Sequence, residues 1–135
     1  MAASELVVAI DPGTEKCGVA VVGPNRAYLQ QVVNRVELIE ALRNILQTWP
    51  ICLVVIGDRT GSKDFEKEIR ASFPELKIHL VDEHLSSQEA RLRYWEHNPP
   101  RGLRRLIPTT MQVPPEPFDD YVAVILGERY FQGNE

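Results

Sequence analysis

The chain has 135 residues, of which 44% are hydrophobic and 25% charged, as expected of one globular domain with a single core. No apolar run approaches the ~20 residues that a membrane-spanning helix needs, and the start lacks the basic and apolar regions of a signal peptide, so we expect a cytoplasmic protein. The formal net charge of −4 argues against tight, indiscriminate binding to duplex nucleic acid.

Strands dominate the first half of the chain. Three are expected, at residues 5–11, 17–22 and 26–33, separated by the turn sequences Pro12-Gly13 and Gly23-Pro24-Asn25. Asn34 and Glu37 resemble an N-cap and its capping-box partner. Apolar residues then recur at helical spacing until Trp49-Pro50 ends the predicted helix.

The second half alternates strands and helices. Strands are expected at 51–57 and 76–81, and a short helix between them at 62–73. Ser86 and Glu89 form a capping-box pattern that opens a helix to about residue 96. A Pro-rich stretch without periodicity follows at 98–117, and Asp119 is expected to cap a last helix that ends near residue 131.

The resulting order is β-β-β-α-β-α-β-α. Two hairpins followed by two right-handed crossovers predict a mixed five-stranded sheet with helices on both faces. This is the order of the RNase H-like fold. We therefore expect residues 1–135 to form one domain, with 98–117 as an inserted loop. Cys17 and Cys52 lie within predicted strands and are expected to be buried thiols, as in a reducing compartment.

Acidic residues end three of the apolar runs and begin the last helix: Asp11, Asp58, Asp82-Glu83 and Asp119-Asp120. In an open α/β sheet the carboxyl ends of parallel strands share one edge, where ligands bind. Carboxylates gathered there repel one another unless cations lie between them, and hard oxygen ligands suit Mg²⁺ or Mn²⁺. The pattern favours a metal-dependent hydrolase of phosphodiesters.

Each acid also has a purely structural explanation. Asp11-Pro12-Gly13 is good turn chemistry, and Asp58 lies beside Arg59, with which a surface ion pair is possible. Asp119 and Asp120 suit the beginning of a helix. Each explanation is adequate for one acid alone. They do not explain why four separate segments all place acids at one edge of the predicted sheet.

Three motifs carry a family resemblance: residues 10–21 (IDPGTEKCGVAV), 81–90 (VDEHLSSQEA) and 119–126 (DDYVAVIL). Together and in this order they resemble the YqgF/RuvX family of RNase H-like nucleases, which are described as Holliday junction resolvases and as nucleases that mature pre-16S rRNA. The resemblance implies that Asp11, Glu83 and Asp119 bind two Mg²⁺ or Mn²⁺ ions and catalyse cleavage. Asp120, Asp58 and Asp82 are possible additional acids.

The sequence also departs from the family pattern. Gly57-Asp58-Arg59 replaces a Gly-Leu-Pro-like loop, His84 replaces the usual arginine, and the 98–117 insert is long. These differences indicate a divergent branch of the family. Asp58 lies where some other RNase H-like enzymes carry a metal ligand.

Substrate-binding candidates lie around the second motif and in the insert: Lys16, His84, Arg101, Arg104 and Arg105. Tyr94 and Trp95 could stack on unpaired bases, although core packing is the simpler explanation for Trp95. These features favour an RNA precursor with single-stranded flanks over branched DNA. The alternatives are a RuvC-like junction resolvase acting as a homodimer, and a non-catalytic binding module. An actin-like ATPase, which shares an Asp-Pro-Gly-Thr-like loop, would need a longer chain.

Overall fold

A mixed five-stranded sheet forms the centre of the molecule. The computed structural model describes residues 5–58 and 62–133, except for the side chain of residue 52. The strands are β1 (Leu6–Asp11), β2 (Lys16–Val22), β3 (Ala27–Asn34), β4 (Ile51–Gly57) and β5 (Ile78–Val81), in the spatial order β3-β2-β1-β4-β5. β1 pairs antiparallel with β2 and parallel with β4. The predicted RNase H-like sheet is therefore confirmed, with β1 at its centre.

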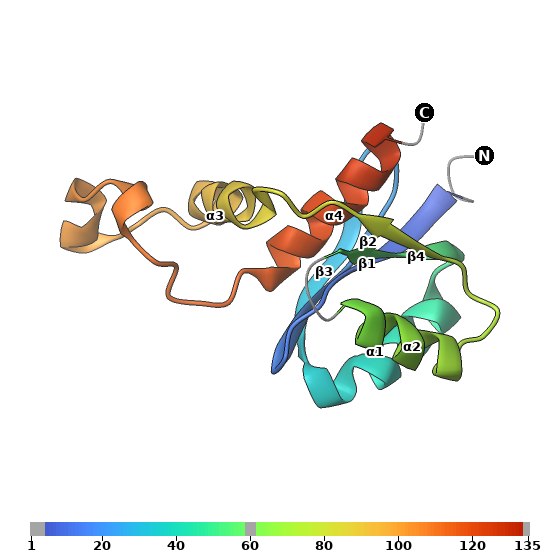
Figure 1. Ribbon diagram of the computed structural model, residues 1–135. Helices are drawn as coiled ribbons and strands as arrows, with labels where there is room; N and C mark the ends of the chain where they lie inside the picture. The colour runs from blue at the N-terminus through green and yellow to red at the C-terminus, as the bar shows by residue number, and fades with distance from the viewer. Residues whose placement is uncertain (1–4, 59–61, 134–135) are drawn as a thin grey trace.

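Helices cover both faces of this sheet (Figure 1). The helices α1 (Leu38–Thr48) and α2 (Ser62–Ser72) pack on one face. The helix α4 (Asp119–Gly133) packs on the other face, and α3 (Ser86–His97) lies against α4.

Strict alternation along β1 assigns its side chains to the two faces. Val8 and Ile10 are buried among the α1 and α2 side chains, whereas Val7 and Ala9 are buried against α4. Because successive side chains of a strand point to opposite faces, Asp11 lies on the α4 face. The Asp11 side chain is therefore directed away from α1 and α2.

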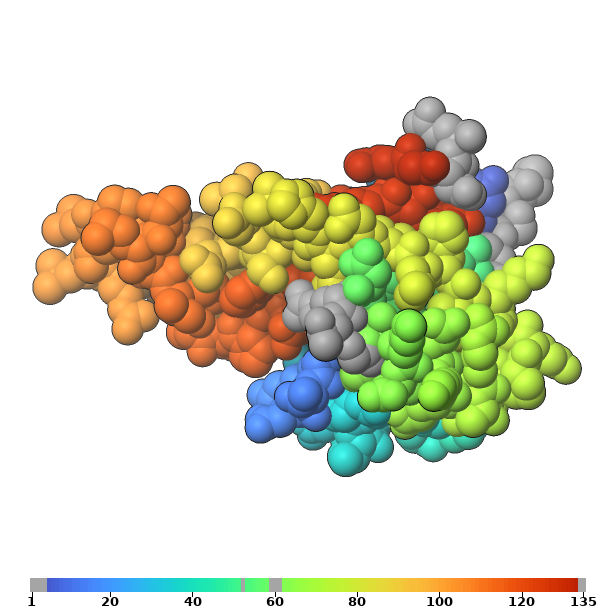
Figure 2. Space-filling view, in the orientation of Figure 1, coloured from blue at the N-terminus to red at the C-terminus, as the bar shows by residue number. Residues whose placement is uncertain are grey.

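The insert leaves the body of the molecule beyond α3. It contains two short 3-10 helices, Gly102–Leu106 and Thr109–Met111, in a stretch where the sequence predicted no regular structure. Figures 1 and 2 show this segment in orange, projecting away from the sheet. We call residues 98–117 the arm.

The predicted helix caps are wrong in detail. Asn34 does occupy an N-cap position, but of a 3-10 helix, Arg35–Glu37, that precedes α1, and its side chain donates to the Glu37 carboxylate at 3.3 Å instead of capping a backbone N–H. Leu85, not Ser86, is the N-cap of α3, with a left-handed φ of 59°. α4 begins at Asp119 itself. The helices begin near the predicted positions, but the predicted side-chain caps are not formed as expected.

Two smaller expectations concern burial and membranes. Cys17 is a buried free thiol, as predicted, and the side chain of Cys52 lies outside the described part of the chain. Among the described residues, no helix combines the length and the apolar character needed to cross a bilayer.

Candidate active site

Asp11 is the last residue of the central strand and is only 3% exposed. It is flanked by glycine on both sides. Gly18 of β2 pairs with it directly, and Gly57 of β4 follows the Ile10–Ile56 pair. Neighbouring strands are about 4.8 Å apart, so the absence of two side chains leaves room beside the carboxylate on the α4 face.

Glu83 occupies the room above Gly57. A Cβ atom at Gly57 would lie 2.2 Å from Cδ and 2.4 Å from Oε2 of Glu83. The Glu83 side chain is 9% exposed. Its carboxylate is therefore buried over the strand position next to Asp11.

Asp119 approaches from the opposite side. A Cβ atom at Gly18 would lie 1.9 Å from the backbone carbonyl oxygen of Asp119. The first turn of α4 thus rests on the residue that pairs with Asp11. Asp11 of β1, Glu83 of the loop between β5 and α3, and the backbone of Asp119 in α4 therefore lie at one end of the sheet, on one face.

These acids fit a hard divalent cation by their chemistry. Carboxylate oxygens are the preferred ligands of Mg²⁺ and Mn²⁺, and burial of negative charge favours a neighbouring cation. However, no three His, Cys, Asp or Glu side chains within residues 5–58 and 62–133 are grouped closely enough to hold an ion. The chemistry of these donors suits a divalent cation, but their side chains are not arranged as a metal site in this structure.

Asp58 and Asp82 hold the chain that carries Glu83. Asp58 is exposed, and its Oδ1 accepts a hydrogen bond from the Glu83 N–H at 3.3 Å. Oδ1 of Asp82 accepts from the His84 N–H at 2.9 Å, which is a local turn. The predicted partner of Asp58, Arg59, lies outside the described residues.

Asp120 points to a different neighbour from Asp119. Its Oδ2 accepts a hydrogen bond from Nε2 of Gln30 on β3 at 2.9 Å. Lys16 and Asp120 line one open groove of about 470 Å³, together with Tyr94 and Glu116. Asp120 and Lys16 therefore lie toward β3 and the arm, at the rim of the candidate site.

The remaining substrate-binding candidates divide into exposed and buried groups. His84, Arg101, Arg104 and Arg105 are exposed. Tyr94 and Trp95 are buried, at 4% and 8% exposure, and their rings contact each other edge to face. The proposed stacking platform for bases is therefore wrong, because both rings face the interior, and core packing of Trp95 is confirmed.

Sequence reasoning overlooked the two glycines. Glycine inside a strand is unfavourable and marks a place where another group approaches closely. Gly18 lies within the buried strand β2, and Gly57 is the last residue of β4, after a run of apolar residues. This signal was present in the sequence and pointed to the same end of the sheet as the acids.

Comparison with known proteins identifies the family of this chain. The family model described as RuvX, Holliday junction resolvase, matches residues 5–106. The chain belongs to the RuvX family. The match contains Asp11 and Glu83, whereas Asp119 lies beyond it.

Two Chlorobium species provide relatives of this RuvX chain. Proteins of Chlorobium luteolum and Chlorobium chlorochromatii, each described as a candidate pre-16S rRNA nuclease, are 34% and 33% identical to it over 97 residues. Each alignment covers 62% of this chain and 69% of the relative. The family is thus one of nucleases.

Solved structures extend the likeness to the whole RuvX fold. Thermus thermophilus RuvC in complex with a Holliday junction substrate matches with a TM-score of 0.57 and 15% identity, over 96% of both chains. A second Thermus thermophilus RuvC structure has a TM-score of 0.53 and 14% identity. At this identity the likeness establishes the RNase H-like fold, including α4, which the family match does not reach.

Proposed function

We propose that this protein is a divalent-metal-dependent nuclease whose metal ligands are Asp11, Glu83 and Asp119. One observation carries the proposal: Asp11 is buried between two glycines, and Glu83 and Asp119 lie over those glycines. Packing alone does not explain why a second carboxylate, that of Glu83, is buried beside Asp11. Mg²⁺ or Mn²⁺, bound as two ions, would supply charge stabilisation for an in-line displacement at phosphorus.

The chain's own residues position this chemistry. The Asp58 carboxylate holds the Glu83 backbone, and we infer that Asp58 acts by orienting Glu83. Asp120 is held by Gln30, and Asp82 by the His84 N–H. We assign the ligand role at the last helix to Asp119, because its backbone lies over Gly18, the residue that pairs with Asp11.

We infer that the substrate is an RNA precursor, processed at the pre-16S end during ribosome biogenesis in the cytoplasm. The description of the Chlorobium relatives supports this choice. The exposed arginines of the arm supply a small basic surface on an acidic protein, which suits a flexible strand. Lys16 and His84, exposed near the acids, would contact phosphates.

A second candidate is cleavage of four-way DNA junctions. The description of the family model and the RuvC fold favour it. Symmetric cleavage of a junction needs two active sites, so this activity would require a homodimer. Sedimentation of the protein with and without a junction would reveal such a dimer.

Asp11→Asn tests the proposed nuclease. The variant should lose Mn²⁺-dependent cleavage of a precursor 16S fragment while keeping its fold, because the amide is nearly isosteric and removes one ligand charge. Its melting temperature without metal should equal or exceed that of the wild type, since neutralising one of several neighbouring acids relieves repulsion. Asp64→Asn, an exposed acid in the first turn of α2, is the control and should cleave normally.

Substrate choice is tested in the same assay. A precursor 16S fragment, a four-way junction and a matched duplex are incubated with the wild type and Mn²⁺ at equal salt. Cleavage of the RNA alone supports the proposal. Symmetric cleavage of the junction with intact RNA would reverse the assignment, and full activity of Asp11→Asn would remove Asp11 from the metal site.

A further inference from the structure

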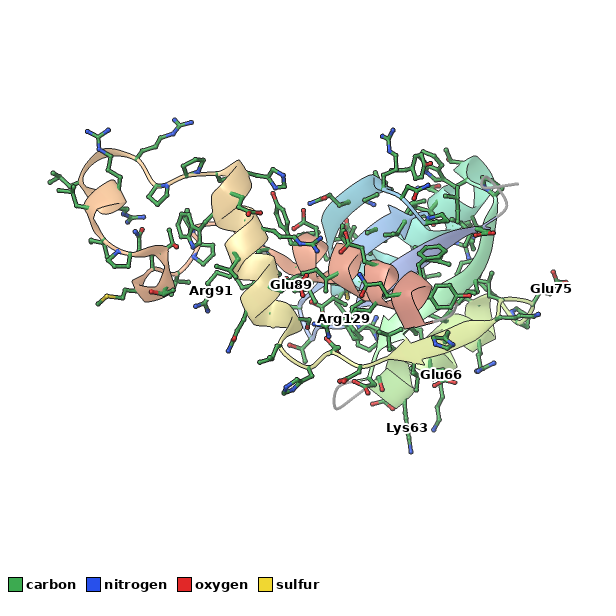
Figure 3. The ribbon with its side chains drawn as sticks, turned by 90° about the horizontal axis from the view of Figure 1, so that it is seen from above. Lys63, Glu66, Glu75, Glu89, Arg91 and Arg129 are labelled. Carbon is green, nitrogen blue, oxygen red and sulfur yellow. The ribbon has the colours of Figure 1, made fainter. Side chains whose placement is uncertain are left out.

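A separate cavity lies where α3 meets the arm. Its volume is about 300 Å³, and it is lined by Gln88, Arg91, Leu92 and Trp95 of α3 and by Thr109 and Thr110 of the arm. Figure 3 shows the labelled Arg91 side chain leaving α3 on the side of the arm. None of these residues belongs to the acid site described above.

The wall of this cavity carries donors and one positive charge. Arg91 is its only ionised side chain, and Gln88, Trp95 and the two threonines can each donate a hydrogen bond. Four other cavities along the described residues each include at least one carboxylate, such as Asp120, Glu40, Glu116 or Asp82. The α3–arm cavity therefore differs in favouring an anion.

Two of these donors are buried and unsatisfied. The Arg91 Nε and Trp95 Nε1 atoms have no hydrogen-bond partner among the described residues. Trp95 is more than nine-tenths buried, at 8% exposure. A buried donor without a partner is costly. Both donors belong to side chains that line one cavity, and a small turn of either side chain would present its N–H to a ligand that supplies acceptor oxygens.

We propose that the α3–arm cavity binds one phosphate-bearing nucleotide unit of the nucleic-acid strand that the enzyme cuts. Arg91 and Trp95 donate to the phosphate oxygens, and the threonine hydroxyls complete the donor set. Leu92, 57% exposed, offers an apolar wall to the sugar. The volume is at the small end of ligand sites, which span about 300–1,000 Å³, and suits a single nucleotide rather than a duplex.

The position of the cavity agrees with this ligand. α3 begins three residues after Glu83 and ends in the arm, so Arg91 lies about 8 Å along the helix axis beyond Ser86. A neighbouring cavity shares Trp95 and adds Arg101 and Arg104. A strand held by the arm would thus pass the cavity on its way to the acids. The proposal rests on the proposed function only for the identity of that strand.

Tryptophan fluorescence can observe this binding without cleavage. The chain has two tryptophans, and Trp49 contacts Tyr28 of β3, so Trp49→Phe leaves Trp95 as the sole reporter. The probes are inorganic phosphate, uridine 5′-monophosphate and a short single-stranded RNA, each with EDTA present. We expect the monophosphate and the RNA to change Trp95 emission, and phosphate to compete with both. If the monophosphate changes Trp95 emission and the RNA does not, the cavity binds a free nucleotide rather than the nucleic-acid strand.

Arg91→Met tests the donor directly. RNA affinity should fall at least about tenfold, as expected for a lost hydrogen bond to a charged group, and the slope of log affinity against log salt should become shallower by about 0.7. The melting temperature without RNA should not fall, because an unpartnered buried donor is removed. Arg43→Met, an exposed arginine on α1, is the matched control. Thr109→Val with Thr110→Val offers a second test if Arg91→Met does not fold.

Two results would overturn the proposal. One is RNA binding that leaves Trp95 emission unchanged. The other is wild-type RNA affinity in a folded Arg91→Met or double threonine variant. Neither result would affect Asp11-dependent cleavage, so the nuclease assignment would stand. Conversely, if the wild-type protein cuts no substrate but still binds RNA through Arg91, the nuclease assignment is wrong and the assignment of the cavity as a nucleotide site stands.

Discussion

Gly57 and Gly18 show how single residues create the space that the acids occupy. Both sit beside Asp11 on the α4 face, but different groups lie over them. The atom above Gly57 belongs to the Glu83 side chain, whereas the atom above Gly18 belongs to the Asp119 main chain. A side chain can rotate away from a new methyl group, and a helix backbone cannot do so without moving the helix.

Alanine at these two positions should therefore have different effects. Gly57→Ala should displace the Glu83 carboxylate and lower cleavage at least about 100-fold, with a loss of about 1–3 kcal/mol in unfolding free energy. Gly18→Ala should destabilise the fold more, because α4 must shift. Urea unfolding and the metal-dependent assay measure both quantities. Gly133→Ala, where a Cβ meets no atom of the described residues within 4 Å, is the control. Full activity of Gly57→Ala would show that Glu83 is not positioned there.

Cys17 gives a pH dependence at the residue scale. Burial is the largest influence and raises the pKa of the Cys17 thiol above its ordinary value of 9.0. In the unfolded chain the thiol loses its proton near pH 9, while the folded protein retains it. The raised pKa therefore contributes stability that is fully present below pH 9 and is lost as the pH rises toward the pKa of the folded protein.

Comparison of wild type with Cys17→Ala measures this contribution. The unfolding free energy of the wild type should decline more steeply between pH 9 and pH 10 than that of the variant. Tyr94, whose pKa burial also raises from 10.0, acts only at higher pH and is present in both proteins. If the unfolding free energies of the two proteins change in parallel with pH, the Cys17 thiol has the same pKa in the folded and the unfolded chain.

At the scale of elements, the strands were predictable because burial leaves a simple pattern. β1 and β4 are continuous apolar runs that end in an acid, and their observed ends differ from the expected ones by at most one residue. Strand 5 is shorter than expected, Ile78–Val81 instead of 76–81, since Leu76 belongs to the preceding turn. Local patterns could not show which residue caps each helix, because a one-residue shift leaves the sequence signal almost unchanged.

The site was predictable only in part for the same reason. Asp11 and Glu83 follow the carboxyl ends of parallel strands, so their proximity can be predicted from the sheet topology alone. The choice between Asp119 and Asp120 depends on helical phase, which rotates by about 100° per residue. The burial of Tyr94 and Trp95 depends on which face of α3 meets α4 and the arm, and a basic composition does not reveal that orientation.

Arg93 joins α3 to α4 and offers a prediction at this scale. Its guanidinium binds Glu128 of α4 at 2.6 Å and Glu89 of its own helix at 2.9 Å, and the hydrogen bond to Glu128 raises the pKa of Arg93. The three side chains are about one-third exposed, so Arg93→Met should cost only about 1 kcal/mol. Arg70→Met, which removes a pair within one helix, should cost less, by urea unfolding. Equal losses would show that the link between the helices adds nothing.

The whole molecule separates its charges. The net charge is −4, yet residues 98–117 hold three arginines and one glutamate. The arm also exposes Leu103, Leu106 and Met111 by 84%, 77% and 76%. A projecting, basic and apolar segment on an acidic body is typical of an interaction surface. Its exposed arginines can contact phosphates at a distance from the acidic residues of the body.

Replacing Arg101, Arg104 and Arg105 together by alanine tests this surface. All three are exposed, so the melting temperature should change little, while RNA affinity should fall. For a single strand each lost phosphate contact should reduce the salt slope by about 0.7, and the triple variant by up to about 2. The control replaces Arg26, Arg43 and Arg70, exposed arginines outside the arm, with the same change in net charge. If both triple variants weaken binding equally, the arm contributes only its charge, and the strand is held by the general field of the protein rather than by contacts along α3.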